Sequence, residues 1–209
     1  MPNETEVARV LLELGAATIG ESGAHAMSAR IKPAWAGARL AAPAYPVQCT
    51  PGDNLAVHVA VTSSPTGAVL VVDVGDEREL GYWGEVLTTA AEARGITGLV
   101  IDGCVRDVTA LARHEFPVFS AGIALPGATK QQPGAVGRSA TVGDVEVHTG
   151  DWVVGDADGV SVIPSGTLED VIAAGRAREQ KEQSFFDALR AGSTTVELLG
   201  LDPSIIDGG

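Results

Sequence analysis

The sequence is poor in basic residues and in aromatic residues. It has 14 lysines and arginines against 27 aspartates and glutamates, so its formal net charge is −13 at pH 7. Without a basic stripe the chain cannot displace counterions from a phosphate backbone, and we predict no nucleic-acid partner. Only 4% of the residues are aromatic although 45% are hydrophobic, so the core is predicted to be aliphatic.

Cysteines and long apolar runs are also scarce. Cys49 and Cys104 are the only cysteines, and their spacing fits neither a zinc motif nor a disulfide framework, which favours a reduced, cytoplasmic location. No run approaches the ~20 apolar residues of a membrane helix, and no basic segment followed by an apolar one opens the chain. We therefore predict no signal peptide and no membrane partner. The length suits a single domain, residues 1–209.

Apolar runs alternate with helical patterns in the middle of the chain. The predicted order is strand 68–74, helix 85–93, strand 98–102, helix 108–116 and strand 118–122. Strands that are apolar on both faces and alternate with helices are typical of a parallel sheet covered on both sides. The predicted fold class is therefore α/β with a central parallel sheet.

Before this stretch we predict a helix, an extended segment and a second helix. Asn3 can cap the first helix, and Gly15 can end it. Residues 37–49 read as extended, but their two prolines restrict them to an edge or a bulge of a sheet. Asp53-Asn54 precedes the second helix, and either forms a loop that faces a pocket or only caps the helix.

After the central stretch the pattern changes twice. Residues 123–138 are rich in Gly, Pro and Gln and read as a long loop that contains Lys130. Residues 139–164 have short β-prone runs separated by Gly-Asp turns, which predicts a second, mainly antiparallel β layer. Thr167 can then begin a long helix over about residues 168–191.

Candidate site residues fall at the carboxyl ends of the predicted strands, where ligands bind in such sheets. Gly84-Glu85 opens one helix there, and its free backbone N–H groups suit a carboxylate or a phosphate. Arg106 and Asp107 occupy the loop after the next strand. Arg106 adds a permanent cation, and Asp107 adds a hard oxygen ligand for Mg²⁺ or Mn²⁺. The sequence predicts a pocket for a small acid with a metal beside it.

Each of these residues also has a plainer interpretation. Arg106 and Asp107 could form a neutralised pair in which Asp107 caps the next helix, and Glu85 could be a first-turn acid favoured by the helix dipole. Asp102 could orient Arg106 or its loop, or only cap a turn. Cys104 is interpreted as a small buried thiol. Structural or surface positions are predicted for all four histidines, which are His25, His58, His114 and His148.

Several segments, in order, resemble one known family. They are Pro51-Gly52-Asp53-Asn54, AVLVVDVG at 68–75, Gly84-Glu85-Val86-Leu87, VIDGCVRD at 100–107, Phe116-Pro117-Val118-Phe119, Gly150-Asp151 and Asp156-Ala157-Asp158-Gly159-Val160. The likeness, over about residues 14–182, is to the RraA-like family, which joins 4-hydroxy-4-methyl-2-oxoglutarate aldolases with the regulator of ribonuclease activity A. It implies a swivelling β/β/α fold, homotrimers or hexamers, and active sites between subunits.

The aldolase branch of that family implies a specific reaction. A divalent-metal-dependent class II aldolase cleaves a 4-hydroxy-2-oxo acid of the 4-hydroxy-4-methyl-2-oxoglutarate type to pyruvate, with oxaloacetate decarboxylation as a related activity. By motif, Asp107 resembles the direct metal ligand, and Arg106 resembles the residue that binds the keto oxygen and steadies the enolate. Glu85 holds the family's acidic position beside the backbone amides for the pyruvyl carboxylate. The implied substrate-binding residues are Gly84, Glu85, Val86, Leu87, Arg106 and Lys130.

The chemistry agrees with this set of residues. Both reactions leave negative charge on a pyruvate enolate, so cations must lie where that charge develops. Glu85, Asp107 or a metal-bound water could take the proton of the C4 hydroxyl. The family's aldolases also use an acid of the adjacent subunit's C-terminal helix, which contacts the metal through water. Glu179 and Glu182 are the candidates; spacing favours Glu182, and a solvated helix face is the plainer interpretation of both.

Two other functions stay open at this point. The second branch of the family implies a non-catalytic regulator that binds a ribonuclease, and the acidic surface would suit a basic partner. The third is a 2-oxo-acid decarboxylase without aldolase activity. The presence of Glu85 and a C-terminal acid in one chain favours the aldolase.

Overall fold

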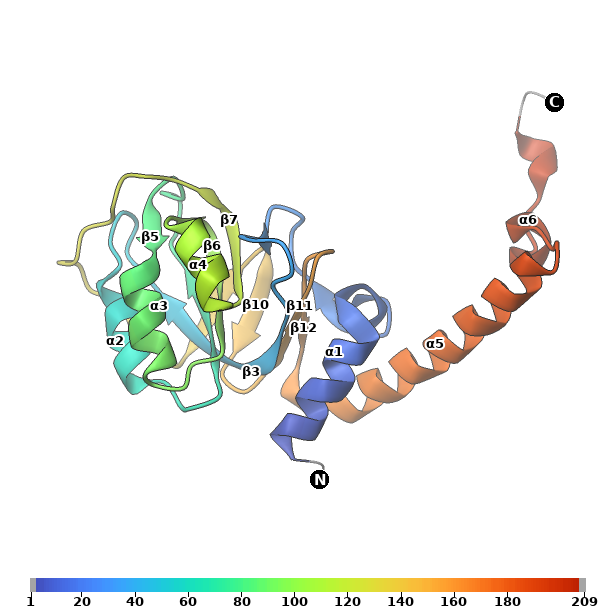
Figure 1. Cartoon of the computed structure of the whole chain (residues 1–209), viewed down its shortest axis with the longest axis horizontal. Helices are drawn as coiled ribbons and strands as arrows, with labels where there is room; N and C mark the ends of the chain where they lie inside the picture. Colours follow the sequence, from blue (N-terminus) through green and yellow to red (C-terminus); the bar gives the residue numbers. More distant parts are fainter. Residues whose placement is uncertain (1–2, 207–209) are drawn as a thin grey trace.

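A computed structural model describes residues 3–206 as a mixed sheet with helices on one face and a β-hairpin on the other (Figure 1). The main sheet runs in the order β1 (His25–Ala26), β12 (Val160–Ile163), β11 (Trp152–Gly155), β3 (Leu40–Gln48), β4 (Val69–Asp73), β6 (Gly98–Val105), β7 (Val118–Ile123) and β2 (Lys32–Pro33). Neighbours from β3 to β7 are parallel, and the outer pairs are antiparallel.

Two short strands and a separate hairpin complete the β structure. β5 (Gly81–Trp83) pairs with β6, and β8 (Ala135–Val136) pairs with β3. β9 (Ser139–Val142) and β10 (Val145–His148) form the hairpin, a sheet of its own. The fold is α/β with a central parallel sheet and a second antiparallel layer, which confirms the predicted fold class.

The helices lie in two groups. α2 (Leu55–Ser63), α3 (Glu85–Glu92) and α4 (Val108–His114) cover the parallel part of the sheet. α1 (Glu4–Gly20) and α5 (Leu168–Arg190) pack on each other beside the antiparallel part, and α6 (Thr195–Leu199) follows. α5 runs away from the body on the side opposite α2 and α3 (Figure 1). Within residues 3–206, no helix is both long and apolar enough to cross a membrane.

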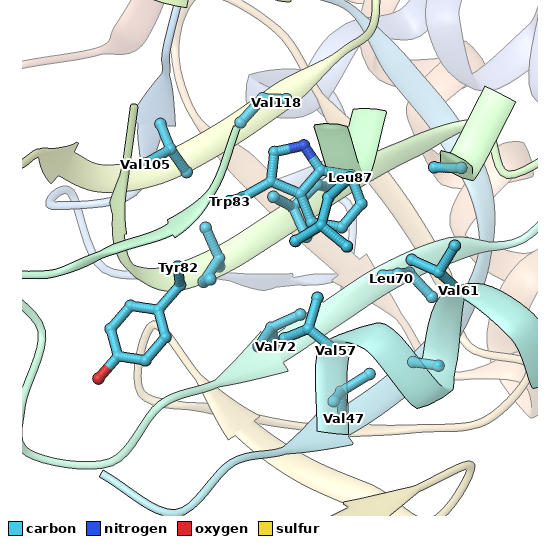
Figure 2. Close-up of a cluster of buried hydrophobic side chains, with 14 of the residues drawn as sticks. Val47, Val57, Val61, Leu70, Val72, Tyr82, Trp83, Leu87, Val105 and Val118 are labelled. Atoms are coloured by element: carbon cyan, nitrogen blue, oxygen red, sulfur yellow. The ribbon is translucent and has the colours of Figure 1, made fainter. Parts of the chain in front are cut away.

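The core consists of three aliphatic clusters, as the low aromatic content predicts. The largest lies between the parallel strands and α2–α4, where Val57 and Val61 face Leu70 and Val72 (Figure 2). The second lies between the sheet and the β9–β10 hairpin, and the third lies under α1. Trp83 is one of the few aromatic members, and its ring stacks on the ring of Phe116 at a centroid distance of 5.9 Å.

The prediction that the proline-rich segment lies at an edge or a bulge was wrong. β3 is a central strand, paired with β11 at residues 40–43 and with β4 at residues 44–48. Ala44 N donates to Asp151 O and Pro46 O accepts from Gly137 N, so even-numbered residues face β11 and β8. Pro46 therefore faces away from the β4 ladder, and Pro43 precedes that ladder. Neither proline therefore interrupts the ladder with β4, and Pro46 lacks only the N–H that would face Gly137, beyond the end of β8.

Two predicted boundaries also moved. Gly15 has φ 79° and ψ 160° and interrupts the first helix, but a second helical piece follows to Gly20. Asp156 Oδ2 accepts from Ala16 N at 2.8 Å and so supports the start of that piece. The strand predicted at 98–102 continues to Val105, because β5 replaces β4 as its partner beyond residue 101.

Candidate active site

Strand β5 brings together the two predicted parts of the site, Gly84-Glu85 and Arg106-Asp107. It lies parallel to the end of β6, with Gly81 opposite Cys104 and Trp83 opposite Val105. The backbone N–H of Arg106 donates to Trp83 O at 2.9 Å. Because Gly84 follows β5 and Asp107 follows β6, the start of α3 lies against the Arg106-Asp107 pair. The sequence did not predict β5, whose three residues are too few for a recognisable strand pattern.

Asp107 adopts an unusual backbone conformation at the start of α4. Its φ is 59° and its ψ is 32°, in the left-handed region, and its side chain makes no capping hydrogen bond to α4. Instead, Asp107 Oδ2 accepts from the backbone N–H of Glu85 at 3.1 Å. The plainer interpretation, that the side chain only caps the next helix, was wrong. The carboxylate crosses to the N-terminus of α3, where the helix dipole favours negative charge.

Three glycines make room for the Arg106 and Asp107 side chains. A Cβ atom on Gly84 would lie 2.4 Å from Asp107 Oδ2 and 3.1 Å from Arg106 Cγ. A Cβ on Gly81 would lie 3.0 Å from Arg106 Cδ, and one on Gly127 would lie 3.4 Å from Arg106 Nη1. Any larger residue at one of these three positions would therefore narrow the space that the Arg106 side chain occupies. Its ion pair with Asp107 spans 3.8 Å and both side chains are partly exposed, so its guanidinium can bind a ligand.

Six of the predicted site residues line one cavity of about 240 Å³: Gly84, Val86, Leu87, Arg106, Asp107 and Lys130. Three larger hollows, of about 640, 340 and 300 Å³, are lined by neither arginine nor lysine. A small organic acid needs a cation in its site. The smaller cavity, which has two, is therefore the candidate active site.

The side chain of Glu85 points to a different partner. Its carboxylate lies 2.6 Å from Arg113 Nη2 and 3.5 Å from His114 Nε2, on the last turn of α4. Glu85 is not among the residues that line the cavity. Its catalytic role stays a prediction, and it requires the carboxylate to turn from Arg113 towards the cavity.

A buried aspartate holds the loop that carries Lys130. Asp53 Oδ2 accepts from Thr129 Oγ1 at 2.7 Å, from Gln131 N at 2.6 Å and from Gln132 N at 3.1 Å. Its other oxygen accepts from Leu55 N at the start of α2. Burial raises the pKa of Asp53, but these hydrogen bonds outweigh burial, so the pKa lies well below its usual value. Asp53 therefore supports both the helix and the pocket loop.

Asp102 does not contact Arg106, and the prediction that it orients Arg106 directly was wrong. The nearly buried carboxylate binds Arg30 at 2.7 and 2.9 Å, Arg78 at 3.1 Å and the backbone N–H of Gly143 at 3.2 Å. Burial raises its pKa, but the hydrogen bonds and charges of the two arginines outweigh burial and lower it. Arg78 belongs to the segment before β5, so Asp102 holds the approach to the site.

Two residues of α2 and its N-cap also form part of the cavity wall. Asn54 and His58, one turn apart at the start of α2, line it beside Arg106. The prediction that Asp53-Asn54 faces a pocket is confirmed for Asn54, whereas the sequence predicts only a structural or surface position for His58. No local pattern signals the position of His58, because it depends on the packing of α2 against the 127–130 loop.

A sequence model of the RraA-like family, described as Aldolase/RraA, matches residues 16–162. The chain belongs to the RraA-like family. A protein of Halalkalibacterium halodurans with the provisional name 4-hydroxy-4-methyl-2-oxoglutarate aldolase is 33% identical over 158 residues, which are 76% of this chain and 75% of that protein. The family predicted from the VIDGCVRD segment is confirmed.

Solved structures show that the RraA-like fold extends over nearly the whole chain. An uncharacterized protein of Pseudomonas syringae pv. tomato has a TM-score of 0.84 at 28% identity, covering 95% of this chain and 94% of that one. Streptomyces coelicolor RraAS2, described as an unusual member of the RNase ES inhibitor RraA family, has a TM-score of 0.74 at 24% identity, covering 88% and 96%. The second likeness shows the fold alone.

The side chains at the RraA-like cavity fit a hard divalent cation held mainly by solvent. Asp107 supplies a partly exposed carboxylate on the cavity wall. Residues 3–206 contain no cluster of three or more His, Cys, Asp or Glu side chains that could bind a metal. A zinc site usually needs three or four such ligands, whereas Mg²⁺ keeps several waters and binds one or two carboxylates. Within the described part of the chain, Asp107 is the one lining carboxylate that could hold the Mg²⁺ or Mn²⁺ that the sequence predicts, and the metal itself stays a prediction.

The predicted C-terminal acid lies far from this cavity within one RraA-like chain. Glu182 is on α5, which projects from the side opposite α3 (Figure 1). Its carboxylate lies 2.9 Å from Arg178 Nε, and Arg178 also contacts Glu21. Glu182 therefore has no route to Asp107 of its own chain. Its predicted role depends on a neighbouring copy.

Proposed function

We propose that the chain is a divalent-metal-dependent class II aldolase that cleaves a 4-hydroxy-2-oxo acid to pyruvate. The observation that carries the proposal is the cavity where Arg106, Asp107, Lys130 and the N-terminus of α3 converge. The identity of 33% to a provisionally named 4-hydroxy-4-methyl-2-oxoglutarate aldolase supports the substrate class. Oxaloacetate decarboxylation is the related activity that the same groups would support.

The chain's own residues can bind the substrate and stabilise charge. The first-turn N–H groups of Val86 and Leu87 have no acceptor within α3, and they would receive the carboxylate of the pyruvyl half. The guanidinium of Arg106 would bind the keto oxygen and stabilise the negative charge that develops there as the carbon–carbon bond breaks. Asp107 would hold Mg²⁺ or Mn²⁺, which when bound supplies a second positive charge at the same enolate.

Proton transfer completes the reaction. The C4 hydroxyl must lose its proton as the bond between C3 and C4 breaks, and the enolate carbon must then gain one. Glu85, at the start of α3, is the first candidate base, but its carboxylate accepts a hydrogen bond from Arg113 in this structure. Among the described residues that line the cavity, Asp107 is the one carboxylate, so it is the second candidate base.

Assembly into a homotrimer or hexamer would complete the site. α5 has only Val171 and Gly175 buried, and Phe186 near its end is 47% exposed. The following segment exposes Leu199, Leu201, Ile205 and Ile206. Such a helix is stabilised when a neighbouring copy covers its apolar residues. A neighbour would also bring its Glu182 to the cavity of the next chain, as the family resemblance implies.

Pyruvate release tests this function directly. The coupled assay with lactate dehydrogenase would use 4-hydroxy-4-methyl-2-oxoglutarate or oxaloacetate, with Mg²⁺, Mn²⁺ or EDTA. We expect metal-dependent release by the wild type and loss of at least 100-fold in Asp107→Ala, because the metal and the anchored carboxylate are lost together. No release from either substrate with any metal, by folded protein, would contradict the proposal.

A ribonuclease regulator is the second candidate function. The net charge of −13 favours it, because an acidic surface would suit a basic partner. A pulldown of a ribonuclease that needs neither metal nor oxo acid, together with no pyruvate release, would favour the regulator. The cytoplasmic location stays a prediction for both functions.

A further inference from the structure

The cavity wall contains two buried polar atoms without a hydrogen-bond partner. Within residues 3–206 only three buried side-chain atoms have none: Asn54 Oδ1, His58 Nε2 and the hydroxyl of Ser64. The first two belong to residues that line the cavity of Arg106 and Asp107. Buried polar groups are nearly always paired, so two unpaired atoms at one cavity indicate a position for a ligand.

The free atom of Asn54 can only accept a hydrogen bond. Asn54 is 4% exposed, and its Nδ2 donates to Tyr82 O at 2.8 Å, which leaves Oδ1 as the unpaired atom. Its backbone N–H donates to Thr129 O at 2.9 Å, so the residue is fixed at both ends. A carboxylate or a keto oxygen cannot donate to Oδ1. A hydroxyl group can.

His58 presents the complementary atom. Its backbone N–H donates to Asn54 O at 3.3 Å across one turn of α2, so the two side chains share a helix face. Burial, and secondly the charge of Lys130, lower the pKa of His58, so the imidazole is neutral at pH 7. In the tautomer that is protonated at Nε2, this unpaired atom is a hydrogen-bond donor on a residue that lines the cavity.

We propose that Asn54 and His58 form the subsite for the hydroxyl group on the leaving half of the substrate. In the bound substrate the hydroxyl donates to Asn54 Oδ1 and accepts from His58 Nε2. Before the carbon–carbon bond breaks, it turns its proton to the base of the proposed function, Glu85 or Asp107, while His58 Nε2 keeps its hydrogen bond to the oxygen. Lys130, on the same wall, provides a cation for a carboxylate of that half. The inference rests on the proposed aldolase function and narrows its substrate to hydroxylated 2-oxo diacids. Oxaloacetate has no such hydroxyl and leaves Asn54 Oδ1 unpaired.

The size of the cavity supports one shared ligand. Its volume of about 240 Å³ lies below the roughly 300–1,000 Å³ of typical ligand pockets. The cavity therefore places Arg106 and the Asn54–His58 pair within reach of one small substrate molecule. A site built to hydrogen-bond a substrate hydroxyl discriminates strongly against the analogue that lacks it.

The experiment compares two substrates across matched variants. We would measure kcat/KM for 4-hydroxy-4-methyl-2-oxoglutarate cleavage and for oxaloacetate decarboxylation in the wild type, His58→Leu and His58→Gln. His25→Leu, an exposed histidine outside the cavity, is the control. In His58→Leu we expect the ratio of the two values to fall by about 10- to 100-fold. His58→Gln places an amide N–H near the position of Nε2, so it should restore most of the ratio.

Two further readouts exclude general damage to the fold or to the pyruvyl end. The midpoint of thermal unfolding identifies any variant that fails to fold, and inhibition by pyruvate reports on the end that Arg106 binds. An equal loss for both substrates in folded His58→Leu, or no change in the ratio, would overturn the subsite. No pyruvate release by the wild type from either substrate would instead refute the proposed function, and the subsite with it.

Discussion

At the scale of single residues, the site depends on a glycine that its neighbours require. Gly84 has no Cβ, and this absence lets the Asp107 carboxylate reach the N-terminus of α3. The backbone of Gly84 is extended, with φ −165°, so its conformation alone does not demand glycine. The contact with Asp107 therefore decides the residue type.

Gly84→Ala should displace the Asp107 carboxylate, because the new Cβ would lie 2.4 Å from Oδ2. We expect kcat/KM for pyruvate release to fall about 100-fold, since a misplacement near 1 Å has that effect, with a stability loss of only about 1–3 kcal/mol. Steady-state kinetics and thermal unfolding measure the two effects. Gly166→Ala, which meets nothing within 4 Å, is the control. Unchanged kinetics in Gly84→Ala would show that Asp107 tolerates the shift.

Asp102 should make the free energy of unfolding decrease as the pH falls into the acidic range. Because its pKa is lower in the folded chain, the carboxylate stabilises the fold above the unfolded pKa of about 3.9, and this contribution is lost as the pH falls below that value. Asp102→Asn should lose about 2 kcal/mol at pH 7, since its arginine partners are partly exposed. Between pH 7 and pH 3, the free energy of unfolding should change less with pH in the variant than in the wild type. An equal slope in both proteins would contradict this account.

At the scale of elements, one loop depends on one carboxylate. The segment 129–132 makes three of its hydrogen bonds to Asp53, and it carries Lys130 over the cavity. The helix α2 begins at the same residue, so the loop and the helix are fixed together. If this loop became mobile, the Lys130 ammonium group would leave the cavity while the sheet beneath the loop stayed unchanged.

Asp53→Asn should loosen that loop, because an amide replaces one accepting oxygen with a second donor. We expect KM for the oxo acid to rise about 10-fold and the fold to lose roughly 1–3 kcal/mol. Hydrogen exchange of the Gln131 and Gln132 amides should accelerate in the same variant. Asp73→Asn, at another turn where the carboxylate accepts from Gly75 N, is the matched control. Protected amides together with a raised KM would place the effect elsewhere.

At the scale of the whole molecule, the two predicted halves of the metal site lie on opposite sides of one chain. Mixing subunits tests whether neighbouring copies join them. Asp107→Ala and Glu182→Ala should each be nearly inactive alone. An equimolar mixture, unfolded and reassembled together, should recover about one quarter of wild-type activity, because a quarter of the interfaces pair intact residues from both chains.

The control mixture combines Asp107→Ala with the double variant Asp107→Ala/Glu182→Ala. This mixture can form no intact site, because both chains lack Asp107. Size-exclusion chromatography with light scattering would confirm that both mixtures form the same assembly. If the first mixture recovers no activity, Glu182 does not act across an interface. The exposed apolar residues of α5 and α6 would then need another explanation.

The sequence alone determined the family, the α/β class, the long C-terminal helix and six of the thirteen described residues that line the cavity. These depend on local patterns: apolar runs, glycines at turns, and the VIDGCVRD segment that places Arg106 beside Asp107. Only the tertiary structure decided the rest. β5 forms because β6 extends beyond the end of β4, Glu85 pairs with Arg113, Asp53 holds the Lys130 loop, and His58 joins Asn54 at the cavity. Each of these contacts joins residues distant in sequence, and no local periodicity records which distant residues a fold brings together.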